Sequence, residues 1–462
     1  MINYELFEHQ KRGLCEALTN NGNFGLFFEM GLGKCLTSLE IFKALRAKNP
    51  NLRLLVICPK SLINLSWGED IKRFSDFTYS ALKDSDKGDI LLINFELLIT
   101  KRYFSKVMQL VSTGDFMCVI DESARMKSHS SLTTKTILKL RDYFKHRLIL
   151  TGVPCPNNET EYWAQIRFIS DVFPPSFFQF RNQYFHLARG NQVIPQGAIT
   201  NRWNMQEYYR KGYKYEISAQ NRERLLKLIA PHVLWKSIDE TDDMPERIDI
   251  FREVELSPVE RKAYEDMRKY LVAEIGDITI ASPLALTKLL KLRECTSGFM
   301  YDDKLNAIEI GNSKLNELEE VLEELGQKQA IIFIEFKHEL HKIEQLLVKK
   351  YGCDSYTTLY SETDDKDEAI RLFTSGQARY LIANTQSGSH GLNLQSCHTI
   401  IYFSLSYSYE KYSQSKGRIF RKGQKNNCVY IHLIAAQSID QIILKTLQRK
   451  GSLLELAKEI IG

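Results

Sequence analysis

The sequence predicts an α/β protein made of two similar lobes, each a parallel sheet covered by helices. Short β-branched runs alternate with segments of helical length through both halves of the chain, as in strands joined by crossover helices. A chain of 462 residues is also too long for one ordinary domain. The predicted strands are residues 25–28, 54–58, 90–94, 118–121 and 148–151 in the first half, and 330–334, 380–383, 399–403 and 429–433 in the second.

Domain boundaries follow from changes in composition between these strands. Lobe 1 is expected at 1–238, with a helical and aromatic insertion at about 171–232 that shows no clean strand pattern. Residues 239–250 begin with an acidic run that contains Pro245, and they are predicted to be the interlobe linker. Lobe 2 is expected at 251–462. It opens with a helical protrusion at about 257–295, its sheet begins near Ala330, and an amphipathic brace helix at about 438–461 closes it.

Charge and cysteine content restrict the class of protein. The net charge of +5 permits a nucleic-acid partner without requiring one. The nine cysteines are scattered and form no paired C-x-x-C motif, so neither a zinc site nor a disulfide framework is indicated. The first residues lack the apolar core of a signal peptide, and no run is apolar enough to cross a bilayer. We expect a cytoplasmic chain without a membrane partner, associated with the nucleoid if it is prokaryotic or phage-encoded.

The clearest motif is a glycine loop between a strand and a helix. Glycines let the backbone wrap around phosphates, the helix N-terminus attracts the anion, and Lys34 would contact the β- and γ-phosphates of ATP. A tight turn joining strand to helix is the alternative, but the strand before and the amphipathic helix after favour phosphate binding. The predicted contacts are Met30, Gly31, Leu32, Gly33, Lys34 and Cys35.

Cys35 departs from the pattern of such loops. A Ser or Thr normally follows the lysine, and its hydroxyl binds Mg²⁺. Magnesium prefers oxygen ligands, so the thiol of Cys35 is a weak candidate ligand, and water could take its place. Two alternatives therefore stay open: that Mg²⁺ binds weakly, and that the protein binds the nucleotide without hydrolysing it.

Two acids end a hydrophobic strand in FMCVIDESARMKS. Asp121 would hold Mg²⁺ through the water shell of the ion, and Glu122 would orient or deprotonate the attacking water. A strand that ends in two acids is also common as a solvated turn. The presence of Lys34 upstream favours the catalytic interpretation.

A series of blocks runs along nearly the whole chain in a fixed order: LFEHQ, EMGLGK, VICPKSLINLSW, INFELL, DESARMKS, LTGVPCPNN, SKLNELEEVL, AIIFIEF, ANTQSGSHGLNL and QSKGRIFRKGQ. In this order they resemble superfamily 2 helicase-like ATPases, and specifically the SNF2 family. The short insertion after Trp163 resembles the compact, distant members that include annealing helicases. The resemblance implies two RecA-like lobes that use ATP and Mg²⁺.

The resemblance also implies further nucleotide contacts. Gln10 would recognise adenine through its amide, and Gly391 and Gln414 would complete the nucleotide site. The pair Thr151–Gly152 would couple the γ-phosphate to movement of the lobes.

Two arginines are implied as arginine fingers. Arg418 and Arg421 lie three residues apart on a helix-like stretch, so both should point the same way. Such arginines stabilise the transition-state phosphate from across the cleft, an effect worth ~10³–10⁵ in rate. The alternative is an ordinary basic helix face.

The family binds the phosphates of one strand with both lobes, so the matching positions are predicted to contact double-stranded DNA. Small polar groups and backbone amides suit phosphate oxygens and do not distinguish bases, so we expect salt-sensitive binding by a monomer with little sequence specificity. The predicted contacts are Lys60, Ser61, Asn94, Phe336, Thr385, Gln386 and Asn393.

Basic and aromatic residues also alternate in the insertion. They would either contact DNA or form the core of a small helical subdomain. The residues concerned are Arg202, Arg210, Lys211 and Lys214 among Trp203, Tyr208, Tyr209 and Tyr213.

The leading hypothesis is a DNA-stimulated ATPase that moves along duplex DNA. Beside Cys35, two further departures from the family bear on coupling between ATP and DNA: Ala124 stands where relatives carry a histidine, and Ser389–His390 stands where they carry Gly-Leu. The alternatives are a strand-separating or RNA-remodelling helicase, and a nucleotide-gated DNA clamp with low turnover, which Cys35 and Ala124 motivate.

Overall fold

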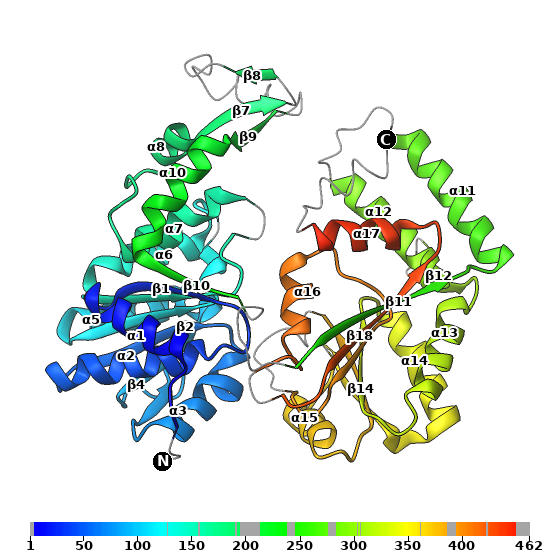
Figure 1. The fold of residues 1–462 in the computed structure, drawn as a ribbon, viewed down its shortest axis with the longest axis horizontal. Coiled ribbons are helices and arrows are strands. Elements are labelled where there is room, and N and C mark those ends of the chain that lie inside the picture. The colour runs from blue at the N-terminus through cyan, green and yellow to red at the C-terminus, as the bar shows by residue number, and fades with distance from the viewer. Residues whose placement is uncertain are drawn as a thin grey trace. The chain divides into compact units, whose positions relative to one another are not determined.

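The chain forms two compact units, Met1–Asp242 and Asp243–Gly462. Each is a sheet flanked by helices, as Figure 1 shows. The computed structural model describes residues 4–126, 128–155, 158–189, 192–194, 213–237, 245–275, 283–302, 304, 306–360, 362–385, 394–421 and 424–449.

Unit 1 is built on a seven-stranded sheet in the order β10-β1-β6-β5-β2-β4-β3, in which all neighbours are parallel. The five predicted strands are confirmed within two residues at either end. Two edge strands were not predicted, because β3 is only three residues long and β10 follows the insertion. The strands are β1 Asn23–Phe28, β2 Arg53–Cys58, β3 Tyr79–Ala81, β4 Ile90–Asn94, β5 Phe116–Asp121, β6 His146–Leu150 and β10 Val233–Lys236.

Helices cover the sheet of unit 1, so the central strands are buried along almost their whole length. This burial explains why these strands are continuous apolar runs with no polar face. The helical segments are α1 Glu8–Thr19, α2 Lys34–Lys48, the π-helical η1 Ile63–Gly68, α3 Glu69–Phe74, α4 Phe95–Leu98, α5 Lys101–Thr113, η2 Ser123–Met126, α6 Leu132–Leu140, η3 Arg141–Tyr143, η4 Glu159–Glu161 and α7 Tyr162–Ile169.

The insertion is not purely helical, and this part of the prediction was incomplete. It contains a three-stranded antiparallel sheet in the order β8-β7-β9 beside two helices. The aromatics of its first half are core residues, since Phe180, Tyr184 and Phe185 are buried in the apolar cluster of unit 1. The sequence did not predict β7, because the aromatic residues before it show no alternating pattern and because β7 pairs with β9, which is distant in sequence. The elements are α8 Phe177–Tyr184, β7 Phe185–Arg189, β8 Gln192–Ile194, β9 Lys214–Ile217, α10 Ala219–Ile229 and η5 Ala230–His232.

The basic residues predicted in the insertion are only partly covered by the structure. Lys214 is exposed on β9, and Tyr213 directly before it is half-buried. Residues Arg202, Trp203, Tyr208, Tyr209, Arg210 and Lys211 lie outside the described residues.

Unit 2 is built on a six-stranded parallel sheet in the order β11-β18-β17-β14-β16-β15. The four predicted strands are confirmed, and β11 and β15 are added. The expected start of this sheet near Ala330 was wrong, because β11 already pairs with β18 and takes in residues 247–250 of the predicted linker. Most of β11 is exposed and half of its residues are charged, so it does not form the continuous apolar run of the buried strands that the sequence predicts. The strands are β11 Arg247–Val254, β14 Ala330–Ile334, β15 Tyr356–Leu359, β16 Tyr380–Asn384, β17 Thr399–Tyr402 and β18 Cys428–Ala435.

After β11, two helices lie where the sequence predicts a helical segment, namely α11 Pro258–Ile275 and α12 Pro283–Thr296. The predicted C-terminal helix is present as α17 Ile439–Gln448, which packs on α12 and β18 (Figure 1), while residues 450–461 lie outside the described residues. In the part of the chain that the structure describes, no helix is both long and apolar enough to cross a membrane. The other elements are β12 Phe299–Tyr301, β13 Ala307–Glu309, α13 Ser313–Glu324, α14 Lys337–Tyr351, η7 Cys353–Ser355, α15 Lys366–Thr374 and α16 Tyr409–Lys416.

A buried ion pair joins four of these elements. Lys314 on α13 lies 2.5 Å from Asp440 on α17, and their side chains are 1% and 8% exposed. Asp440 also accepts hydrogen bonds from Thr296 Oγ1 on α12 at 3.1 Å and from the backbone N–H of Ala435 on β18 at 3.2 Å. A buried carboxylate is tolerated only when it is paired in this way.

We predict that Lys314→Met lowers the free energy of unfolding of unit 2 by about 3–5 kcal/mol, because it leaves the Asp440 carboxylate buried without its cation. Chemical denaturation would measure this. The double variant Lys314→Met, Asp440→Asn removes both charges and should regain most of the loss. A single variant as stable as the parent chain would contradict the role of the pair.

Candidate nucleotide and metal site

The glycine loop connects β1 to α2 with two residues in the left-handed region. Gly31 has φ 82° and Gly33 has φ 74°, which other residues adopt only at a cost in strain. A Cβ at Gly33 would also lie 2.2 Å from Gln10 Nε2, so no side chain fits there without displacing Gln10. The loop therefore needs glycine for two independent reasons, and it leads directly into the N-terminus of a 15-residue helix, where backbone N–H groups can bind an anion.

Lys34 is the first residue of α2, and its side chain lies back along the loop. Its Nζ donates hydrogen bonds to the carbonyl oxygens of Phe28 at 2.8 Å and Glu29 at 3.3 Å. The ammonium group is thus held at the end of β1, within electrostatic reach of Asp121 at the end of β5. The structure brings together two of the predicted catalytic residues that are 87 positions apart in sequence.

Helix α1 contacts the loop through two consecutive side chains. Gln10 is buried, its Oε1 accepts from the Phe7 N–H at 3.0 Å, and its Nε2 makes a long hydrogen bond of 3.4 Å to the Gly33 carbonyl oxygen. His9 Nε2 lies 3.0 Å from the carbonyl oxygen of Leu32. In this conformation Gln10 supports the loop itself. The contact made by His9 was not predicted.

Asp121 ends β5, as the sequence predicts, and Glu122 follows it in a turn. The buried Asp121 accepts one hydrogen bond on each carboxylate oxygen, from Trp67 Nε1 at 2.9 Å and from the Glu122 backbone N–H at 2.9 Å. Burial raises the pKa of Asp121, although the charge of Lys34 and both hydrogen bonds oppose this rise. Glu122 has φ 57°, a conformation that costs a residue other than glycine about 1–3 kcal/mol and is concentrated at functional sites.

Trp67 is a residue of this site that sequence reasoning missed. It lies in the block VICPKSLINLSW, but nothing in that block indicates that its indole N–H would contact an acid 54 positions away. The tryptophan is fully buried. A hydrogen bond from a neutral donor to a buried acid both orients the acid and satisfies one of its oxygens.

Of the two candidate metal ligands, the carboxylate of Asp121 suits Mg²⁺ and the thiol of Cys35 does not. Each Asp121 oxygen accepts a single hydrogen bond and keeps a lone pair for the water shell of a metal ion. Burial, followed by the charges of Asp121 and Asp70, raises the pKa of Cys35 well above its usual range, so the group beside the site is a neutral thiol. Among the described residues no group of three His, Cys, Asp or Glu side chains could hold a metal. Nucleotide-bound Mg²⁺ takes most of its ligands from phosphates and water.

Thr151 and Gly152 follow β6 and lie beside the glycine loop. The Thr151 N–H donates to the Leu26 carbonyl oxygen of β1 at 3.3 Å, and its hydroxyl accepts from the Val153 N–H at 3.2 Å. A Cβ at Gly152 would lie 3.4 Å from the Phe28 carbonyl oxygen, in ordinary contact with the start of the loop.

The predicted finger arginines lie just beyond a helix and not on it, which corrects the expectation of a helix-like stretch at these positions. Helix α16 ends at Lys416 with Gly417 as its C-cap, so Arg418 and Arg421 lie in the following turn. Arg418 is fully buried, whereas Arg421 is half-buried and donates from Nε to the Gly417 carbonyl oxygen at 2.8 Å. Gln414 is buried on the last turn of α16, and Gly391 lies outside the described residues.

The predicted DNA contacts of unit 1 lie at the carboxyl ends of two paired strands. Lys60 and Ser61 follow β2, Asn94 ends β4, and Cys58 pairs with Asn94 in the sheet. Lys60 is exposed and Ser61 half-buried. The side-chain N–H of the buried Asn94 donates to Glu96 at 3.0 Å.

Arg125 links this edge to the acidic pair. It lies three residues after Glu122 and forms an ion pair of 2.7 Å with Glu96, which in turn accepts from Asn94. Ala124, at the position of the missing histidine, is buried and offers no such contact. The sequence did not predict the Arg125–Glu96 ion pair, because relatives carry their polar residue at position 124 and Arg125 is one residue further on.

The predicted contacts of unit 2 show the same arrangement. Phe336 follows β14 and Thr385 follows β16, and Ile334 pairs with Asn384 where these strands end. The Thr385 hydroxyl donates to the Glu335 carboxylate. Gln386 and Asn393 lie outside the described residues.

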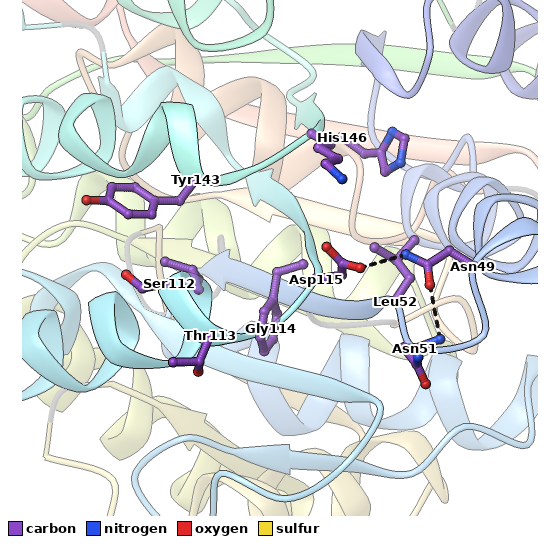
Figure 2. A pocket seen from close by; sticks show the side chains of 12 residues that line it. Asn49, Asn51, Leu52, Ser112, Thr113, Gly114, Asp115, Tyr143 and His146 are labelled. Carbon is purple, nitrogen blue, oxygen red and sulfur yellow. Dashed lines mark hydrogen bonds between the residues drawn. The ribbon is translucent and has the colours of Figure 1, made fainter.

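A hollow on the opposite edge of unit 1 is separate from these residues. Figure 2 shows that its lining includes Asn49, Asp115 and His146, with Asn49 donating to Asp115 at 3.0 Å. It lies where β2, β5 and β6 begin. Ligands of parallel α/β sheets bind beyond the carboxyl ends of the strands, so we assign it no role.

The fold and the glycine loop together define a P-loop nucleotide-binding protein with two parallel-sheet units. The model of the SNF2-related domain matches residues 9–301, and that of the helicase conserved C-terminal domain matches residues 313–423. The chain therefore belongs to the SNF2 family of helicase-like ATPases, for which ATP is the implied nucleotide, and the predicted resemblance is confirmed.

Individual relatives are distant in sequence. The chain is 25% identical to the transcription regulatory protein SNF2 of Saccharomyces cerevisiae over 97% of its own length and 27% of that protein. It is 25% identical to an uncharacterized ATP-dependent helicase, MG018, of Mycoplasma genitalium over 97% of its length and 42% of that protein. It thus spans less than half of either relative. The solved Sulfolobus solfataricus SWI2/SNF2 ATPase core in complex with dsDNA is 22% identical, with a TM-score of 0.45 over 100% of this chain and 93% of that one.

We predict that Trp67→Phe lowers the free energy of unfolding of unit 1 by about 1.5–3 kcal/mol, because it removes a hydrogen bond to a buried acid. Trp163→Phe is the matched control, since the buried Trp163 donates to the neutral carbonyl oxygen of Pro174 at 3.0 Å and its loss should cost about 0.5–1.5 kcal/mol. Urea denaturation compares the two. Equal losses would show that the charge of Asp121 does not strengthen its hydrogen bond to Trp67.

Proposed function

We propose that this chain is an ATP-dependent DNA translocase, in which duplex DNA stimulates ATP hydrolysis and hydrolysis moves the protein along the duplex. The observation that carries the proposal is a shared sheet edge in unit 1. Lys34 and Asp121 lie at the same carboxyl edge as Lys60, Ser61 and Asn94. Candidate nucleotide and polymer contacts therefore lie along one edge of one sheet, so a ligand bound at one set of residues would lie near the other set.

For the nucleotide, the N–H groups of the loop and the ammonium of Lys34 would bind the triphosphate. Magnesium would be held through Asp121 and would neutralise phosphate charge when bound. Glu122 would orient the attacking water. Arg421 is the better placed of the two arginines to act as a finger, because its side chain is half-buried while Arg418 is fully buried.

For the polymer, an exposed cation and small polar groups suit the phosphates of a DNA backbone. Lys60 would contribute a charge whose effect falls with salt, and Ser61 would contribute a hydroxyl without base preference. The proposal therefore includes little sequence specificity. The ion pair of Arg125 with Glu96 supports a connection from these residues to the acidic pair, where Ala124 cannot provide one.

The second candidate is a nucleotide-gated DNA clamp with low turnover. It is favoured by the neutral, half-buried thiol of Cys35 and by the apolar Ala124, since both remove polar groups that relatives use in hydrolysis and coupling.

Hydrolysis assays with different polymers separate these functions. We expect duplex DNA to raise the rate of ATP hydrolysis about tenfold or more, single-stranded DNA and RNA to do less, and added salt to reduce the stimulation. Equal stimulation by RNA or by single strands would favour a strand-separating or RNA-remodelling helicase. ATP binding without stimulation by any polymer would favour the clamp.

We predict that Arg421→Ala lowers the hydrolysis rate at least ~10³-fold while ATP affinity changes little, because a finger acts on the transition state. Arg371→Ala is the control, since Arg371 is an exposed arginine of unit 2 that forms a local ion pair with Glu368. Single-turnover hydrolysis and equilibrium ATP binding measure the two effects. Unchanged hydrolysis would remove Arg421 from the finger role.

A further inference from the structure

The segment that follows Lys60 and Ser61 has an unusual backbone. Residues Ile63–Gly68 form the π-helical segment η1, directly before α3. Short π-helical turns are rare and are frequent at functional sites. This segment carries two consecutive side chains, Ser66 and Trp67, that contact two different residues of the candidate metal site.

Each contact is specific. The Trp67 indole N–H donates to Asp121 Oδ2 at 2.9 Å, which connects η1 to the carboxylate that would hold the ion. The Ser66 hydroxyl lies 3.8 Å from the Cys35 sulfur. Ser66 and Cys35 are both half-buried, in contrast to the fully buried Trp67.

Cys35 marks the position at which a P-loop hydroxyl would stand, because its Sγ is bonded to Cβ as the Oγ of serine or threonine would be. In octahedral Mg²⁺ with oxygens at about 2.1 Å, neighbouring ligand oxygens are about 3 Å apart and opposite ones about 4 Å apart. The Ser66 oxygen lies 3.8 Å from Sγ, between these two separations, so it is close to the coordination shell that a hydroxyl at position 35 would join.

We propose that the hydroxyl of Ser66 serves nucleotide-bound Mg²⁺ in place of the hydroxyl that Cys35 lacks, as a ligand or as a hydrogen-bond partner of a metal-bound water. The hydrogen bond between Trp67 and Asp121 holds Ser66 at the site. The missing oxygen donor is supplied from η1, 31 residues away in sequence from the P-loop. The inference rests on the proposed use of Mg²⁺ and ATP.

The test measures metal affinity and not turnover. Mn²⁺ is titrated into the full chain with bound ADP and followed by electron paramagnetic resonance, in the parent, Ser66→Ala, Cys35→Thr and the double variant. We expect Ser66→Ala to weaken Mn²⁺ binding about tenfold, the lower end of what the loss of a supporting group at a metal site costs. In the Cys35→Thr background the same change should have less than a twofold effect, because the threonine restores the donor.

Ser38→Ala is the matched control. Ser38 lies near the same loop, but its hydroxyl donates to the backbone carbonyl oxygen of Cys35 at 2.8 Å. Loss of this hydroxyl should therefore leave Mn²⁺ affinity unchanged. ADP binding in EDTA should be the same for Ser66→Ala and the parent, which shows that the site is folded.

The outcomes separate this inference from the proposed function. A Ser66→Ala variant that binds Mn²⁺–ADP as tightly as the parent, or that loses the same affinity in both backgrounds, overturns the role of Ser66 and leaves the ATPase proposal standing. A parent chain that binds no nucleotide with or without metal overturns both.

Discussion

Parallel strand pairing is the constraint on which the rest of this structure depends. Because the strands of the main sheet in each unit run in one direction, every segment that follows one of these strands emerges at the same edge of that sheet. The register aligns Cys58 with Asn94 and Asp121 with Leu150, so the residues that follow β2, β4, β5 and β6 become neighbours. A one-residue slip of one strand would move each of its side chains to the opposite face of the sheet and would shift the residues that follow it out of this alignment.

This edge carries buried charge, and burial determines its chemistry. Asp121 is held by Trp67 and by the Glu122 N–H in an environment that raises its pKa, and Glu122 adopts a strained left-handed backbone beside it. Both features cost stability. They are maintained by the sheet around them, which is buried along almost all of β1, β2 and β5. Groups fixed in this way need little rearrangement when a charged ligand binds. Electrostatic stabilisation is strongest when polar groups are already in place before binding.

The two main departures from the family pattern, Cys35 and Ala124, each have a polar side chain of another residue beside them. Cys35 lacks a hydroxyl, and Ser66 lies beside its sulfur; Ala124 lacks an imidazole, and Arg125 next to it pairs with Glu96. A residue-by-residue comparison of motifs registers only the losses. The proposals made for Ser66 and Arg125 share one physical idea. A site needs a polar group at a given place in the structure, and a residue at a different sequence position can provide it.

The sequence by itself determined the α/β class, nine of the thirteen strands in the two main sheets, and the glycine loop with Lys34 and the acid pair. These are local properties, since buried parallel strands require continuous apolar runs and phosphate loops require glycine. Only the tertiary structure decided that β11 and β15 join the second sheet, that β7, β8 and β9 form a third, that Arg418 is buried while Arg421 is half-buried, and that Trp67 contacts Asp121. The edge strand β11 is largely exposed and carries charged residues along its length, and a hydrogen bond between residues 54 positions apart leaves no periodicity in the chain. Such contacts exist only once the sheet has assembled around them.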